Sequence, residues 1–94
     1  MDRVVYPALT AFAPDLILVS SGFDGSALDP LGHQMLTAKF YGDVAARLVG
    51  FNTPLVFVHE GGYNENYVPL CGVRVVEALA GVERSNVVDV MQVR

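Results

Sequence analysis

Apolar residues form two short continuous blocks and three longer periodic segments along the chain. The blocks run from Asp15 to Ser20 and from Pro54 to His59, and both are too short for core helices. Because neither block alternates apolar with polar residues, each predicts a strand that is buried on both faces.

The first two periodic segments predict helices. Helix-forming residues extend from Asp2 to Phe12, where Pro7 marks a start or a kink and Pro14 ends the segment. Thr37 can cap a second helix, which Gly50 stops. Its apolar stripe recurs every fourth residue and is flanked by a second row: Phe40, Val44 and Leu48, with Tyr41, Ala45 and Val49.

The third periodic segment predicts a last helix. Five of its residues fall on one helical face, and Gly81 supplies the stop: Val68, Gly72, Val75, Val76 and Leu79. Beyond it, Val82 to Arg94 has no clear pattern, so a strand, a further helix and a contact with a missing part of the chain all stay open. No repeat or linker interrupts residues 1–94, which predict one continuous unit.

The order of these elements predicts an α/β fold, a parallel sheet with flanking helices joined by a right-handed crossover. A loop rich in Gly, Asp, Pro and Ser runs from Ser21 to Met35, and a second loop begins at Glu60. Both follow the carboxyl ends of neighbouring strands, which is where open α/β sheets place their active sites.

Composition suggests that the chain belongs to a larger core. Hydrophobic residues make up 52% of its 94 positions and charged residues only 17%, an unusual balance for so small a domain. No apolar run approaches the roughly 18 residues of a membrane span, and the N-terminus has no pattern of a signal peptide. We therefore expect no membrane association and a cytoplasmic location.

Charge and cysteine content narrow the function further. The net charge is -4 and no basic cluster is present, so we expect no direct binding to nucleic acid. The single Cys71 lies in a helical pattern beside Leu70 and Val73. A buried structural thiol fits this position better than a nucleophile.

Asp24 is the carboxylate of interest in the first loop, a few residues after the end of a predicted strand. A carboxylate in this place can bind a metal or orient a base, although Asp is also favoured in turns, where it bonds its own backbone. Both interpretations stay open on local sequence alone. Asp29 precedes Pro30 and is an even better turn residue, to which we assign no chemistry.

Tyr63 is the candidate in the second loop, directly after Gly61 and Gly62. The glycines let the backbone pass close to a ligand, and the phenol can donate a hydrogen bond to a developing oxyanion. Alternatively, Tyr63 packs its ring on the core and leaves its hydroxyl in water.

The only two histidines, His33 and His59, lack the spacing of a metal motif. A zinc site closed by Asp24, His33 and His59 is a further arrangement with three ligands and water, but no ligand spacing supports it.

Three segments together resemble the class II histone deacetylases, and among them most closely the bacterial histone deacetylase-like amidohydrolases. They are Pro14 to Asp24, Asp29 to Gly32 and His59 to Asn64, which occur in the family's order and spacing. The resemblance covers about residues 2–82. It implies an arginase-deacetylase fold, of which residues 1–94 would be a C-terminal fragment.

The same resemblance implies a role for each candidate residue. Asp24 matches a zinc ligand of the family, and Tyr63 matches the tyrosine that stabilises the oxyanion. Leu31 matches an apolar wall of the substrate tunnel, and Gly61 and Gly62 match glycines beside the substrate's alkyl chain. The implied reaction is zinc-dependent hydrolysis of acetyl-lysine or an acetylated polyamine.

One departure from the family pattern limits this expectation. The family's His-His pair and Asp-x-His zinc ligands are absent, and a single carboxylate cannot hold catalytic zinc. We therefore expect the isolated chain to be inactive, and its uncovered sheet edge to favour self-association or association with the missing N-terminal part. A non-catalytic interaction domain that retains the fold is the alternative.

Overall fold

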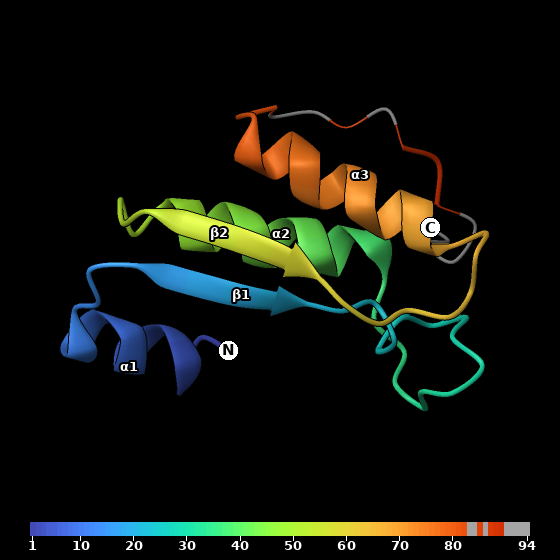
Figure 1. Cartoon of the computed structure of the whole chain (residues 1–94), viewed down its shortest axis with the longest axis horizontal. Helices are drawn as coiled ribbons and strands as arrows, with labels where there is room; N and C mark the ends of the chain where they lie inside the picture. Colours follow the sequence, from blue (N-terminus) through green and yellow to red (C-terminus); the bar gives the residue numbers. More distant parts are fainter. Residues whose placement is uncertain (83–84, 86, 90–94) are drawn as a thin grey trace.

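The computed structural model describes residues 1–82, 85 and 87–89, which contain three helices and two strands (Figure 1). In chain order they are α1 (Val5–Phe12), β1 (Ile17–Ser21), α2 (Ala38–Val49), β2 (Leu55–His59) and α3 (Val68–Leu79). No helix in this described part is long and apolar enough to cross a membrane.

The strands β1 and β2 pair in parallel, which confirms the predicted sheet. Ile17 is aligned with Leu55 at one end of the pair and Ser21 with His59 at the other. Both strands therefore end at the same edge, and Figure 1 shows the loops that follow them meeting beyond the arrowheads.

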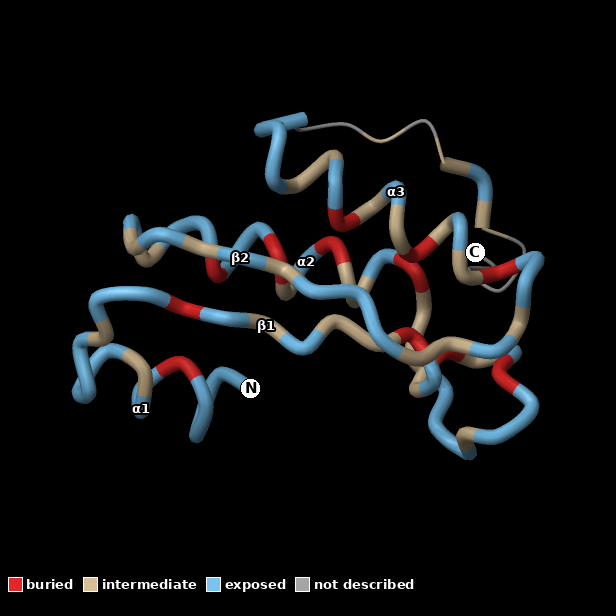
Figure 2. Tube along the Cα trace, viewed as in Figure 1, coloured by how far each residue is buried: buried red, intermediate tan, exposed pale blue. Residues whose placement is uncertain are grey.

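Only one face of this sheet is well covered within the described residues (Figure 2). Ile17 is buried and Phe57 packs against the main apolar cluster. Leu18, Val56 and Val58 point to the opposite face, where 67%, 45% and 53% of their surfaces are exposed. The prediction that both strands are buried on both faces is therefore wrong for this chain, because its helices cover a single face.

The main apolar cluster joins α2 and α3 to the first loop. Its buried members come from three parts of the chain: Phe23, Ala38, Ala45, Tyr67, Cys71 and Val75. The predicted stripe of α3 is only partly confirmed. Val75 is buried, but 63% of Val76 and 42% of Leu79 are exposed, because they project away from this cluster.

Tyr67 also fixes the beginning of α2 through its buried hydroxyl. The hydroxyl accepts a hydrogen bond from the Ala38 N–H at 2.9 Å and donates one to Asp89 Oδ2 at 2.7 Å. Asp89 belongs to the segment that the sequence left unassigned. Of that segment, residues 83–84, 86 and 90–94 lie outside the described part of the chain.

Helix ends follow the predicted signals with one difference. Thr37 caps α2 by accepting the Phe40 N–H, and Gly81 follows α3 with a left-handed φ of 81°. Gly50 ends α2 as predicted, but its backbone is right-handed at φ -64°. The left-handed residue is Asn52, two positions later.

The short helix α1 packs through Tyr6, its buried residue. The Arg47 guanidinium of α2 lies 4.4 Å from the centre of the Tyr6 ring, and the same side chain pairs with Asp2 at 2.9 Å. The N-terminal part of the α1 segment is thus tied to Arg47 in the C-terminal half of α2.

Cys71 is a structural residue, as the sequence predicted. Its side chain is fully buried in the α2–α3 cluster. Desolvation by burial, with a smaller effect from the negative charge of Asp89, raises the pKa of the thiol to about 12. The thiol is therefore protonated at neutral pH and is unsuited to nucleophilic attack.

Candidate active site

The two loops that leave the sheet lie against each other and form one surface. The Phe23 N–H donates to the Gly61 carbonyl at 3.3 Å, and Asn64 Nδ2 donates to the Leu28 carbonyl at 2.9 Å. A further bond joins Glu60 N–H to the Ser21 carbonyl at 3.0 Å. These bonds fix the second loop to the first part of the first loop, and the candidate residues of both loops share one edge of the sheet.

Asp24 presents an unpaired carboxylate on this surface. Its carboxylate has no hydrogen-bond donor and no cation among the residues that the structure describes. A methyl group on Gly61 would lie 3.3 Å from Oδ2, and one on Gly22 would lie 3.2 Å from Oδ1. Two glycines thus let the backbone pass close to a carboxylate that makes no turn of its own.

Asp29 makes the turn instead. Its buried Oδ1 accepts hydrogen bonds from the N–H groups of Leu31 at 2.8 Å and Gly32 at 2.9 Å. Oδ2 accepts the Tyr63 N–H at 2.7 Å, across the two loops. Desolvation by burial alone would raise the pKa of this carboxyl, but the three N–H donors together lower it.

Tyr63 lies on the exposed side of the second loop. Its side chain is 54% exposed, and its hydroxyl makes no hydrogen bond with the described residues. The alternative in which its ring packs into the core is therefore not realised. Gly61 and Gly62 precede it with φ of 84° and 113°, a conformation that L side chains rarely adopt.

These glycines also have a packing role. A methyl group on Gly62 would lie 3.0 Å from Val68 Cγ2 and 3.1 Å from Phe23 Cβ. The loop can therefore follow this path only because Gly62 has no side chain. Leu31, on the first loop, is 67% exposed, so its apolar side chain is free to contact a ligand.

The histidines do not complete a metal site. The His59 ring stacks on Phe23 with centroids 5.5 Å apart, and its Nε2 donates to the Gly61 carbonyl at 3.1 Å. No three His, Cys, Asp or Glu side chains of the described residues lie close enough to hold a metal ion. The arrangement of Asp24 with His33 and His59 as zinc ligands is therefore wrong.

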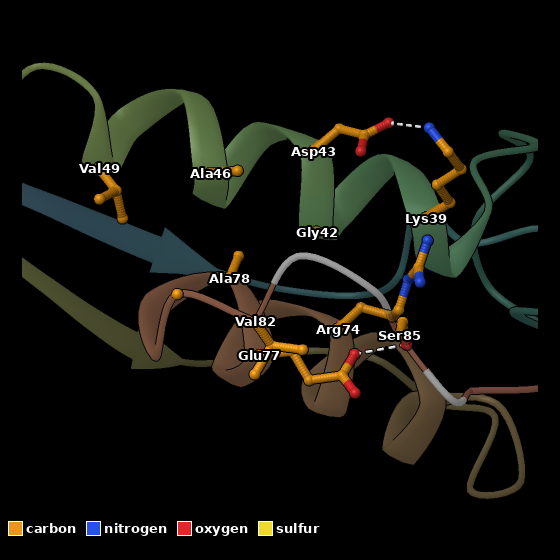
Figure 3. A pocket seen from close by; sticks show the side chains of 11 residues that line it. Lys39, Gly42, Asp43, Ala46, Val49, Arg74, Glu77, Ala78, Val82 and Ser85 are labelled. Atoms are coloured by element: carbon orange, nitrogen blue, oxygen red, sulfur yellow. Dashed lines mark hydrogen bonds and ion pairs between the residues drawn. The ribbon is translucent and has the colours of Figure 1, made fainter.

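A groove of about 450 Å³ lies elsewhere, between α2 and α3 (Figure 3). Several of its charged and polar side chains are already paired with each other. Lys39 Nζ lies 2.6 Å from Asp43 Oδ2, and Ser85 donates to Glu77 at 2.5 Å. Because it is lined by the helices and none of its residues is in the two strand-end loops, we do not assign it to the same site.

A sequence comparison decides the family. Residues 1–79 match the model of the histone deacetylase domain. The chain belongs to the histone deacetylase family. Its parallel strands and flanking helices are part of the arginase-deacetylase fold of its structural neighbours.

Individual members of the family show how much of the domain is present. The chain is 49% identical to a histone deacetylase-like amidohydrolase of Pseudomonas aeruginosa over 95% of its own length, but spans only 24% of that protein. Against the structure of the histone deacetylase Clr3, the TM-score is 0.84 at 34% identity, over 90% of this chain and 14% of that one. An acetylpolyamine aminohydrolase from Burkholderia pseudomallei gives a TM-score of 0.75 at 26% identity, over 82% of this chain and 22% of that one.

The sequence did not identify Asp29 as more than a turn residue. Asp before Pro is a signal for a local turn, and the Leu31 and Gly32 bonds follow from it. The bond to Tyr63 spans 34 positions and has no local signal. It requires both strands to be paired in register before the two loops can meet.

Gly32→Ala should disturb this site, whereas Gly72→Ala should not. A methyl group on Gly32 would lie 1.8 Å from the Asp24 carbonyl oxygen, and one on Gly72 would have no neighbour within 4 Å. We expect Gly32→Ala to lower the free energy of unfolding by about 1–3 kcal/mol through overpacking. Gly72→Ala in α3 should raise it by up to about 1 kcal/mol. Urea unfolding of both variants measures the difference, and equal effects would contradict the contact.

Proposed function

We propose that this chain forms one wall of the active site of a zinc-dependent deacylase, as the C-terminal part of a histone deacetylase-like catalytic domain. The proposed reaction is hydrolysis of acetyl-lysine or a similar acylated amine. The unpaired Asp24 carboxylate carries the proposal, because it lies beside the loop of Tyr63 in a chain of this family.

Asp24 is suited to hold a zinc ion. Carboxylate oxygens are zinc ligands, and no described residue competes for this one. A zinc ion bound here would supply Lewis-acid polarisation of the acyl carbonyl and activation of a water molecule. The glycines at positions 22 and 61 leave the carboxylate accessible from the loop surface.

Tyr63 would donate its hydroxyl hydrogen to the oxygen on which negative charge develops. Such a donor accelerates a reaction only when it is held in place before the charge forms. The bond from the Tyr63 N–H to Asp29 at 2.7 Å holds the main chain of this residue and supports such a role. The hydroxyl itself has no described partner to give up.

Leu31, Gly61 and Gly62 would contact the alkyl chain of the substrate. Leu31 offers an exposed apolar side chain, and the glycines remove bulk from the path beside it. An acylated lysine has such a chain between its backbone and its amide. An acetylated polyamine has one too, and the structural likeness to an acetylpolyamine aminohydrolase favours it as the second substrate class.

The proposal implies that the 94 residues alone are inactive. Catalytic zinc needs about three protein ligands, whereas the described residues bring no such group together. The purified chain should show no deacetylation of an acetyl-lysine peptide with added zinc. Zinc-dependent turnover by the chain alone would contradict this expectation.

Asp24→Asn tests the metal role in a protein that carries the complete catalytic domain. We expect zinc content to fall by at least about tenfold, since the amide is a far weaker ligand than the carboxylate. Asp15→Asn is the matched control, because Asp15 is exposed and lies before β1. Zinc content measured by atomic emission should be unchanged there. Full zinc occupancy in Asp24→Asn would exclude Asp24 as a ligand and would favour the interaction-domain alternative.

Tyr63→Phe tests the oxyanion role in the same protein. The change removes only the hydroxyl, so zinc content should stay constant while kcat for an acetyl-lysine substrate falls about 10²- to 10³-fold. Tyr6→Phe, on α1 and outside both loops, is the control and should keep kcat. A kcat near that of the unmodified protein would remove Tyr63 from the mechanism.

A further inference from the structure

Asp29 makes more hydrogen bonds than a turn requires. One carboxylate oxygen, Oδ1, accepts both N–H groups of the local turn, from Leu31 and Gly32. The other oxygen is directed at the Tyr63 N–H on the second loop, at 2.7 Å. Only 7% of the Asp29 surface is exposed, and among the described residues this buried charge is bound by backbone N–H donors alone.

The need for two acceptor oxygens, Oδ1 and Oδ2, explains why a carboxylate occupies position 29. A local turn needs one acceptor, which Asn or Ser would also supply. A second N–H donor faces the opposite oxygen, however, and there an amide would present its own NH₂ group. Only a carboxylate accepts at both ends, which makes the bond to Tyr63 a specific requirement at position 29.

Asp29 is the only partner of the Tyr63 main-chain N–H among the described residues. Gly61 and Gly62 directly before it have no side chain and lose more conformational entropy on ordering than other residues. The Tyr63 ring is 54% exposed, so packing does not anchor it. The next residue, Asn64, is held separately: it binds the Leu28 carbonyl and accepts N–H groups at the start of α3.

We propose that Asp29 is a positioning residue for Tyr63, which holds the Tyr63 main chain at the edge of the first loop and so sets where its hydroxyl lies relative to Asp24. The proposal rests on the function proposed above for Tyr63. The same carboxylate orders Gly32, which lies directly against the Asp24 main chain. One buried charge thereby links the metal ligand and the oxyanion donor.

Asp29→Asn separates the two roles of this carboxylate, which are to close the local turn and to bind the Tyr63 N–H. The Asn oxygen is expected to stay on the two turn amides, so its NH₂ group would face the Tyr63 N–H and break that bond. In a protein with the complete catalytic domain, kcat should fall on the order of tenfold to a hundredfold, with KM within about twofold and zinc content unchanged. Asp15→Asn is the control and should keep both constants.

A double-mutant cycle with Tyr63→Phe distinguishes positioning from a general structural effect. In the Tyr63→Phe background, which lacks the hydroxyl, Asp29→Asn should lower kcat further by less than about twofold. An equal loss in both backgrounds, or a raised KM with normal kcat, would overturn the positioning role. If kcat falls in Tyr63→Phe but stays normal in Asp29→Asn, this inference alone is overturned. If kcat stays normal in Tyr63→Phe, the proposed function of Tyr63 is overturned.

Amide hydrogen exchange tests the bond without any variant, should Asp29→Asn fail to fold. With ¹⁵N-tyrosine labelling, the Tyr63 amide should exchange at least about tenfold more slowly than in an unstructured peptide, although its side chain is exposed. The helical Tyr41 amide serves as a protected reference. Exchange of Tyr63 at the unprotected rate would overturn the inference.

Discussion

Parallel pairing of β1 with β2 determines where every candidate residue of this chain lies. Because the strands run in the same direction and in register from Ile17–Leu55 to Ser21–His59, their carboxyl ends meet at one edge. The loops that follow must then share that edge. A slip of one residue would turn the core-facing side chains to the open face and separate the loops.

Once the loops meet, glycines and one buried carboxylate set their geometry. Gly22 and Gly32 allow main chains to approach more closely than any side chain would permit, at Glu60 and Asp24 respectively. Asp29 then replaces water for three N–H groups from both loops. Within the described part of the chain, the Asp24 carboxylate and the Tyr63 hydroxyl have no hydrogen-bond partner, which is why the proposed chemistry is assigned to them.

Local patterns were enough to predict the elements but not the contacts between loops. Apolar blocks and helix caps such as Thr37 act within a few residues, and the structure has them where the sequence indicates. The exposed face of the sheet at Leu18 and Val56 was not predictable from the sequence. A continuous apolar block predicts burial on both faces whether or not another layer covers the strand. The sequence favoured Asp29 over Asp24 as a turn residue because it precedes Pro30, but the bond of its second oxygen to Tyr63 depends on the paired strands.

The proposed zinc site needs ligands beyond those that the described residues bring together, so the central claim is that Asp24 and Tyr63 act at one site. The most direct measurement is a zinc-edge anomalous diffraction structure of the complete catalytic domain with a hydroxamate bound. The account predicts an Asp24 oxygen about 2.0–2.2 Å from zinc. It also predicts the Tyr63 hydroxyl within hydrogen-bond distance of the hydroxamate carbonyl oxygen. A zinc ion bound without Asp24, or a hydroxamate that Tyr63 does not reach, would contradict it.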